Sequence, residues 1–216
     1  MEGSEFLDRL RRRLAAPAPG PLTHRRPPAP GIPTAEWPQS LDDPAAAFLE
    51  AAAAKGAVTR RSNDGPAAAL AEVVAEESIR TAVVSSDPEA ADAAGLLETT
   101  GVTVVPWDDA GAAARAGLGV TGAVYGIAAT GSIVLDAGRA GGRTASLLPP
   151  VHLAILRADR LLATPADLWR SMPERFPAGP PSQMVVVSGP SKTSDIEMVL
   201  TTGVHGPGRL WICLLG

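Results

Sequence analysis

The chain has 216 residues, of which 45% are hydrophobic and 19% charged, with a formal net charge of -4. This composition is too apolar for a disordered chain, and the negative balance argues against nucleic acid as a partner. No apolar run approaches the roughly 20 residues that span a bilayer, and the arginine-rich start lacks the apolar stretch of a secretory leader. We therefore expect a cytoplasmic protein without membrane insertion.

Cys213 is the single cysteine of the sequence. One cysteine excludes an internal disulfide and a cysteine-based zinc or iron-sulfur site. His24, His152 and His205 lie far apart with no carboxylate at ligand spacing, so no metal site is predicted. We expect no cofactor in this chain, and any redox cluster should sit in a partner.

Residues 1–41 are predicted to form an amino-terminal helix and a proline-rich arm. Phe6, Leu7, Leu10 and Leu14 share one side of a short helix at 5–14 that is rich in arginine. The arginines indicate an acidic or membrane-surface partner, or else a solvated face on a helix whose leucines dock on the body or another subunit. The narrow apolar face favours the second interpretation, and with it a homo-oligomer. Eight prolines within 16–40 predict an extended arm.

Residues 42–216 alternate between helical and strand patterns, which predicts one domain. Helices are predicted at 44–55, 66–77, 87–97, 108–116 and 165–172, and strands at 57–60, 81–85, 102–107, 151–156 and 184–187. Two further extended runs fall within 118–135 and break at 128–131. Repeated strand-helix units predict a three-layer α/β/α fold around a mostly parallel sheet, with mixed strand directions near the carboxyl terminus.

The stretch 184–215 carries the clearest functional pattern. A buried strand is followed by a run of small or polar residues: Ser188, Gly189, Ser191, Lys192, Thr193 and Ser194. Ile196, Val199 and Leu200 then show helical spacing. The run is therefore predicted to start a helix, where its hydroxyls and free backbone N–H groups would bind one anion.

Four titratable residues lie where a role in catalysis has to be considered. His205, which precedes Gly206 in a Gly-Pro turn, suits proton donation or ligand contact as well as it suits stabilising the turn. Asp195 is a second candidate, although the dipole of the predicted helix also accounts for it. Glu197 is explained without chemistry, as the end of an S-x-x-E capping box. His152 is interpreted as a satisfied core residue of a strand.

Two earlier loops are further candidates for ligand binding. Gly131 lies in a tight turn, where bare backbone lets either a ligand or a covering helix approach closely; both alternatives stay open. Arg143 lies in a basic, glycine-rich segment beside hydroxyls at Thr144 and Ser146. It is either a bidentate donor in a loop that closes over an anion or an ordinary charge on an exposed turn.

Common nucleotide and hydrolase motifs are not found. No G-x-G-x-x-G follows a strand, the stretch 189–193 lacks the spacing of a P-loop, and no G-x-S-x-G elbow is present. The sequence motifs therefore give no support for a dinucleotide-binding fold, an ATPase or a serine hydrolase.

Three segments stand in a distinctive order: TGAVYGIAATGSIVL at 121–135, SLLPPVHLAIL at 146–156 and SGPSKTSDIEMVLTTGVHGPGRL at 188–210. Together they resemble the LUD domain family, in particular its lactate utilization protein C group. The resemblance implies a fold similar to the superfamily of glucosamine-phosphate deaminases, ribose-phosphate isomerases and CoA transferases. It also implies a role in the oxidation of L-lactate to pyruvate alongside iron-sulfur partner proteins.

Ala129 departs from the family, which usually has a glutamate in this loop. In the CoA transferases of the superfamily a loop glutamate is the nucleophile that forms the acyl-enzyme intermediate. Its loss counts against acyl transfer here.

Two hypotheses remain. The first is a non-redox accessory subunit that binds a small anion and assembles with cluster-bearing partners. The second is a stand-alone isomerase, deaminase or acyl-CoA transferase acting on a phosphorylated or CoA-linked substrate, with His205 or Asp195 moving the proton.

Overall fold

A computed structural model of the chain describes residues 41–138, 143–194, 200–203 and 205–216. All of them belong to one compact unit, Trp37–Gly216. The predicted helix at 5–14 and the arm at 16–40 lie outside the described residues, as do Asp195 and Glu197. Within the described part, no helix combines the length and apolarity needed to cross a bilayer.

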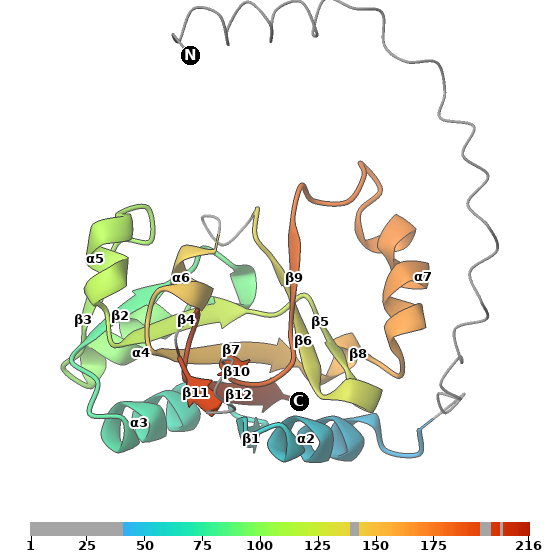
Figure 1. Cartoon of the computed structure of the whole chain (residues 1–216), viewed down its shortest axis with the longest axis horizontal. Coiled ribbons are helices and arrows are strands. Elements are labelled where there is room, and N and C mark those ends of the chain that lie inside the picture. The colour runs from blue at the N-terminus through green and yellow to red at the C-terminus, as the bar shows by residue number, and fades with distance from the viewer. Residues whose placement is uncertain (1–40, 139–142, 195–199, 204) are drawn as a thin grey trace, which may run out of the picture. The chain divides into compact units, whose positions relative to one another are not determined.

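The centre of the fold is a six-stranded sheet in which every pairing is parallel (Figure 1). In spatial order its strands are β1 (Val58–Ser62), β12 (Arg209–Leu215), β7 (Val151–Arg157), β4 (Leu118–Gly122), β2 (Thr81–Val84) and β3 (Thr103–Val105). The strand predictions at 57–60, 81–85, 102–107 and 151–156 are confirmed, with shifts at their ends. β4 and β7 are buried along almost their whole length, as parallel strands covered on both faces should be.

Helices cover both faces of this sheet, which confirms the three-layer architecture. They are α2 (Pro44–Ala54), α3 (Ala67–Glu76), α4 (Ala93–Thr99), α5 (Ala110–Arg115) and α6 (Thr144–Leu147). A further helix, α7 (Pro165–Arg175), packs instead on strands outside this sheet. α3 and α4 bury Leu70 and Leu97 against one face. α2 packs Phe48 against the other face, which α5 and α6 also cover through Ala113 and Ala145.

A second sheet carries the mixed strand directions, whereas the prediction placed them in the main sheet. Its order is β8 (Leu161–Leu162), β5 (Tyr125–Ile127), β6 (Ser132–Asp136) and β9 (Met184–Val187). β6 is antiparallel to both β5 and β9. Ile133 of β6 packs with the core under α2, whereas its neighbour Val134 packs with Leu168 of α7. The run at 118–135 therefore forms three strands, because the chain leaves the main sheet at the end of β4 and enters the second sheet at β5.

The helix predicted at 87–97 is wrong over its first turns. A short 3-10 turn, η1 (Pro88–Ala90), comes first, and α4 begins only at Ala93. The carboxylate of Asp87 does not cap a helix. It accepts hydrogen bonds from the Ser85 hydroxyl and from the Gly122 N–H (3.2 Å), so it ties the end of β2 to the end of β4.

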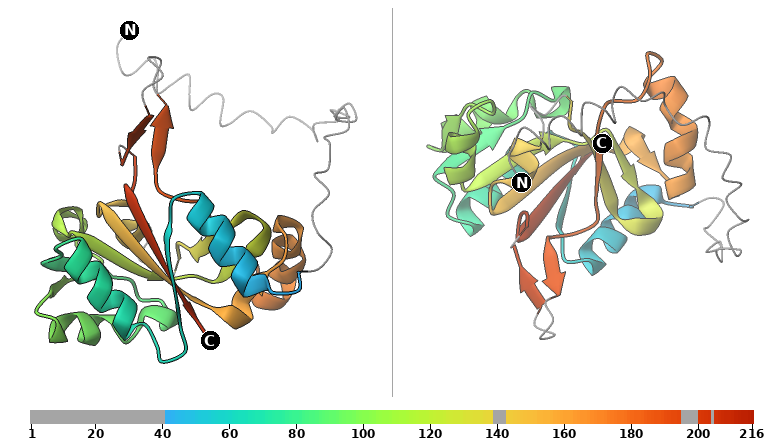
Figure 2. Two further views of the ribbon diagram at one scale, coloured as in Figure 1. Left: turned by 90° about the horizontal axis from the view of Figure 1, so that it is seen from below. Right: turned by 45° about the horizontal axis from the view of Figure 1, so that its top comes forward.

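The assignment of Leu200 to the predicted helix is also wrong. Ser194 lies in strand β10 (Lys192–Ser194) and Leu200 in strand β11 (Leu200–Thr202), which pair in antiparallel fashion and stand away from the two sheets (Figure 2). Residues 195–199, which hold the rest of the predicted helix and the S-x-x-E pattern, lie outside the described part. The physical reason is contact between segments far apart in the sequence. The N–H of Ser191 donates to Pro207 O (2.9 Å), and the N–H of Gly203 donates to Ser191 O (3.0 Å). These bonds align the two segments so that they pair as strands.

Two glycines allow helices to lie directly on strands or turns. Gly131 has a φ of 59°, and a Cβ at this position would fall 2.1 Å from the backbone N of Ala52 in α2. A Cβ on Gly119 of β4 would fall 1.7 Å from the carbonyl oxygen of Ala145 in α6. Of the two alternatives for the bare backbone at Gly131, a ligand or a covering helix, the structure shows the close packing of a helix.

His152 is a core residue, as predicted. Its side chain is 1% exposed and its Nε2 lies 2.9 Å from the Thr121 hydroxyl of β4. It sits beside Gly119 on one side and Leu210 on the other, in register across three parallel strands. Burial lowers the pKa of the imidazole to about 4, so the ring is neutral near pH 7.

The substitution His152→Gln is predicted to flatten the pH dependence of stability between pH 6.5 and about 4. In this window an unfolded imidazole takes up a proton, whereas the buried one stays neutral. The folded state thus binds fewer protons, so its stability is complete above pH 6.5 and falls by up to about 3 kcal/mol as the pH drops. Urea denaturation at several pH values measures this slope. The control His205→Gln, at an exposed position, should keep the wild-type slope, and a wild-type slope in His152→Gln would contradict the account.

Candidate functional site

A small pocket lies between β9, α6 and the loop that precedes β12. We call it the His152 pocket; its volume is about 260 Å³. Of the ligand-binding residues predicted from sequence, five line it together: Ser188, Gly189, Ser191, His205 and Gly206. These residues come from two loops that are more than ten positions apart in the sequence, and the fold brings the two loops together around one pocket.

Hydrogen bonds hold both loops in place. The bonds between Ser191 and its partners Pro207 and Gly203 join the loop after β9 to the loop before β12. The Ser188 hydroxyl lies 2.6 Å from that of Ser132, which in turn lies 2.7 Å from the Thr130 hydroxyl. A chain of three hydroxyls therefore connects the Ala128–Thr130 turn to the pocket.

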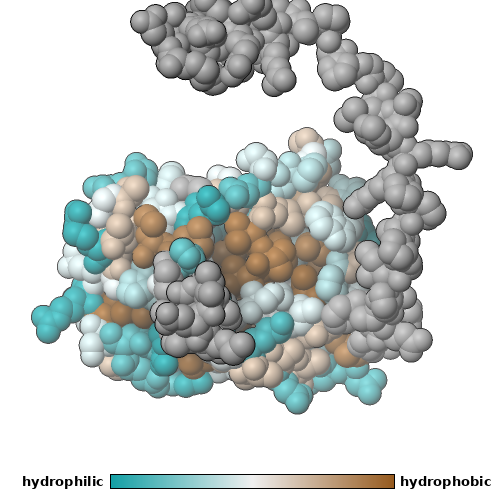
Figure 3. Space-filling model, in the orientation of Figure 1, coloured by the Kyte–Doolittle hydropathy of each residue, from teal (hydrophilic) through white to brown (hydrophobic). Residues whose placement is uncertain are grey.

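The walls combine apolar and polar groups. Leu147, Val187 and Leu210 are among the apolar residues. His152 and the Ser146 hydroxyl supply polar groups from β7 and α6, and sequence reasoning did not assign either of them to a site. Apolar surface also gathers in the middle of this face, over β9, where Val186 is 52% exposed (Figure 3). A ligand here would meet hydroxyl and imidazole groups on one side and hydrocarbon on the other.

A larger hollow of about 460 Å³ adjoins the pocket and shares Leu147, His205 and Gly206 with it. Its other walls are Leu148, Pro149, Pro150 and Gly203. The exposed His205 therefore stands at the boundary between the pocket and the wider surface.

Several predicted site residues lie elsewhere. Gly131 backs onto α2, and the side chain of Arg143 is exposed at the start of α6, although its carbonyl accepts a hydrogen bond from the Ser146 hydroxyl (3.3 Å). Lys192 Nζ donates to Lys55 O (3.2 Å) at the end of α2, a position that favours a cation because it lies at the negative end of the helix dipole. Thr193 and Ser194 belong to β10, and Asp195 lies outside the described residues.

Asp87 is a buried carboxylate that sequence reasoning missed. Its side chain is 4% exposed, and burial raises the pKa of its carboxyl group against the lowering effect of its bonds to Ser85 and Gly122. The signal in the sequence was its place three residues after the buried strand at 81–84, since ligands in open α/β sheets bind outside the carboxyl ends of strands.

Neither metal nor thiol chemistry is evident in the described part. No group of three or more His, Cys, Asp or Glu residues there is arranged to hold a metal ion. Cys213 is fully buried in β12, and burial raises the pKa of its thiol to about 11. The thiol is thus protonated near neutral pH and inert as a nucleophile.

Comparison with known proteins gives relatives that match part of the chain. "Uncharacterized protein YkgG" of Escherichia coli (strain K12) is 42% identical over 91 residues, which cover 41% of this chain and 39% of that protein. "Lactate utilization protein C" of Halalkalibacterium halodurans is 40% identical over 93 residues, covering 42% and 40%. Its namesake in Deinococcus radiodurans is 38% identical over 98 residues, covering 45% of each. The matched part of the chain thus spans about two fifths of the length of these relatives.

A solved structure and a family model extend the comparison to most of the chain. The crystal structure of a DUF162 family protein from Deinococcus radiodurans matches with a TM-score of 0.61 and 22% identity, covering 83% of this chain and 100% of that one. This likeness confirms the α/β fold. The model of the LUD domain matches residues 45–215, which contain both sheets and the His152 pocket, and the chain therefore belongs to the LUD domain family.

Proposed function

We propose that this chain is a lactate utilization protein of the C type, an accessory subunit that binds a small carboxylate such as lactate or pyruvate in the His152 pocket. Relatives that carry the name Lactate utilization protein C support the pathway. The observation that carries the ligand is the convergence of Ser188, Ser191 and His205 on one pocket beside His152.

The size and the lining of the pocket favour a short organic acid. A volume of about 260 Å³ lies below the usual range for drug-sized ligands, which is about 300–1,000 Å³. Hydroxyl and imidazole N–H donors would bind the carboxylate, while Leu147 and Leu210 would contact the methyl group of a three-carbon acid. The neutral His152 supplies a hydrogen bond without a second charge.

Oxidation of lactate to pyruvate releases two electrons and two protons, so an electron acceptor is needed. The one cysteine of the sequence is fully buried in β12, and we expect iron-sulfur partner proteins to supply the acceptor. The described residues lining the His152 pocket include no Asp or Glu. Together with Ala129 in the loop where CoA transferases have their nucleophile, this favours a binding subunit over a stand-alone acyl transferase. Such a subunit would work in the cytoplasm.

Binding of pyruvate to the purified chain tests the ligand. Ser191→Ala and His205→Ala should each weaken binding about tenfold in isothermal titration calorimetry, because each removes a hydrogen bond to a charged group. Ser182→Ala, at an exposed position outside the pocket, is the matched control and should bind like wild type. Lys192→Ala should also keep its affinity, since this ammonium group binds the end of α2. Full affinity in both pocket variants, or its loss in Lys192→Ala, would contradict this site.

Affinity purification from lactate-grown cells tests the partnership. The tagged chain should elute with iron-sulfur proteins, and iron should be measurable in the eluate. An Asp195→Asn variant should support both assembly and growth on lactate, because a binding subunit needs no proton transfer from this residue. Elution without iron-sulfur proteins would sink the accessory role, and loss of growth in a variant that still assembles would favour a catalytic one.

A further inference from the structure

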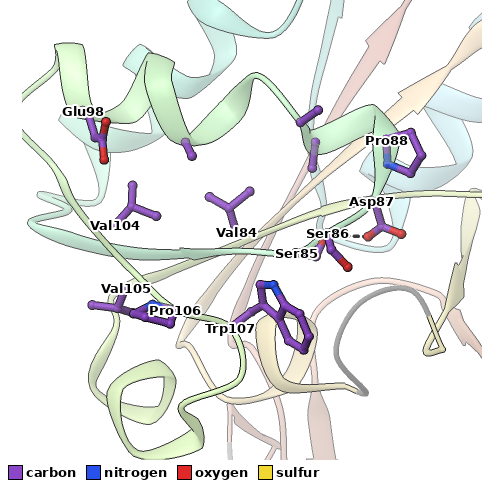
Figure 4. Close-up of a pocket in the computed structure, with 13 residues that line it drawn as sticks. Val84, Ser85, Ser86, Asp87, Pro88, Glu98, Val104, Val105, Pro106 and Trp107 are labelled. Atoms are coloured by element: carbon purple, nitrogen blue, oxygen red, sulfur yellow. Dashed lines mark hydrogen bonds between the residues drawn. The ribbon is translucent and has the colours of Figure 1, made fainter.

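A third cavity, larger than the His152 pocket and separate from it, lies outside the carboxyl ends of β2 and β3. Its volume is about 470 Å³, and we call it the Trp107 slot. Val84 and Val104 form its floor, α4 and η1 one side, and the chain that leaves β3 the other (Figure 4). None of its lining residues is shared with the His152 pocket.

The slot lies next to the point where the chain reverses its direction through the main sheet. From β2 the chain passes outward to β3 at the edge, whereas from β4 it continues inward to β7. Asp87, at the end of β2, binds the Gly122 N–H at the end of β4 and so marks this switch. Open α/β sheets bind their ligands at such a point.

The two long walls suit a flat ring. On one side, Ala90, Ala91 and Ala94 present only small side chains. On the other side stands Trp107, which is 38% exposed even though it is a large apolar residue. Indole faces stack readily on the bases of nucleosides and nucleic acids, and alanines opposite leave room for a ring between the walls.

The polar end of the slot suits a neutral ligand with hydroxyl donors. Among the described residues, Asp87 accepts hydrogen bonds only at Oδ2, from Ser85 and Gly122, which leaves Oδ1 as an acceptor. Glu89 and Asp136 add negative charge near Asp87, and Glu98 adds it elsewhere along the slot. The carboxylates of Asp87 and Glu98 in its lining disfavour a phosphate or carboxylate group in the slot, so the ligand differs in class from the one proposed for the His152 pocket.

We propose that the Trp107 slot binds a nucleoside, with its base stacked on Trp107 and its ribose hydroxyls donating to Asp87. A carboxylate at the end of a strand is a usual acceptor for a ribose diol. The volume lies within the usual range of small-molecule sites, about 300–1,000 Å³. This site stands on residues independent of the proposed function, so either proposal can fail without the other.

Titration calorimetry of the full chain with adenosine tests the proposal. Adenosine should bind saturably, and Trp107→Ala should weaken it about tenfold or more through loss of stacking. Trp107→Phe keeps an aromatic face and should retain most of the affinity, which guards against a general folding defect. Trp169→Ala removes an indole that is 69% exposed on α7, outside the slot, and should bind like wild type.

The diol contact has its own probes. Asp87→Asn should weaken adenosine about tenfold, and 2′,3′-dideoxyadenosine should bind wild type more weakly by a similar factor. The dideoxy compound should bind wild type and Asp87→Asn with equal affinity, because it lacks the ribose hydroxyls that would donate to Asp87. Absence of saturable binding up to about 1 mM adenosine, equal affinity for the dideoxy compound, or unchanged binding in Trp107→Ala would each overturn the proposal.

Discussion

The close approach of α6 to β4 at Gly119 is the contact on which the arrangement around the His152 pocket depends. A Cβ at Gly119 would fall 1.7 Å from the Ala145 carbonyl, so this short helix can lie on the sheet only over bare backbone. The helix carries Ser146 and Leu147 to the edge of the pocket. Gly119 also pairs with His152 of β7. The imidazole and α6 therefore occupy the space that a larger residue at position 119 would fill.

A glycine also allows close helix packing at the second sheet. Gly131 lets α2 pack on the turn before β6, and the hydroxyl chain from Thr130 through Ser132 reaches Ser188 after β9. This hydroxyl chain links the second sheet to the pocket. Each hydroxyl in it has a hydrogen-bond partner, so burying these groups leaves none of them unpaired. Electrostatics then separates this site from the Trp107 slot: hydroxyls and a neutral imidazole line one, and carboxylates lie in or near the other.

How far the sequence predicts this protein depends on the range of the interactions involved. The strands predicted at 81–85 and 151–156 are confirmed, with a shift of one residue at their ends, because each is a buried apolar run whose pattern is local. The helical spacing that includes Leu200 is equally local, yet Leu200 lies in a strand, because the pairing of residues 200–202 with residues 192–194 decides its conformation. Gly131 was undecidable from sequence, since only the position of α2 separates its two alternatives. Asp87 and the place of His152 in a pocket were missed because each depends on strand order, which no single segment encodes.

The central claim is that the loops after β9 and before β12 form one binding site for a small carboxylate. Hydrogen–deuterium exchange of the chain with and without pyruvate tests it most directly, since a bound ligand slows the opening of the loops it touches. Added pyruvate should protect residues 188–191 and 205–207 and leave the turn at 128–131 unchanged. Protection centred on 128–131, or none at either loop at a saturating concentration, would contradict the claim.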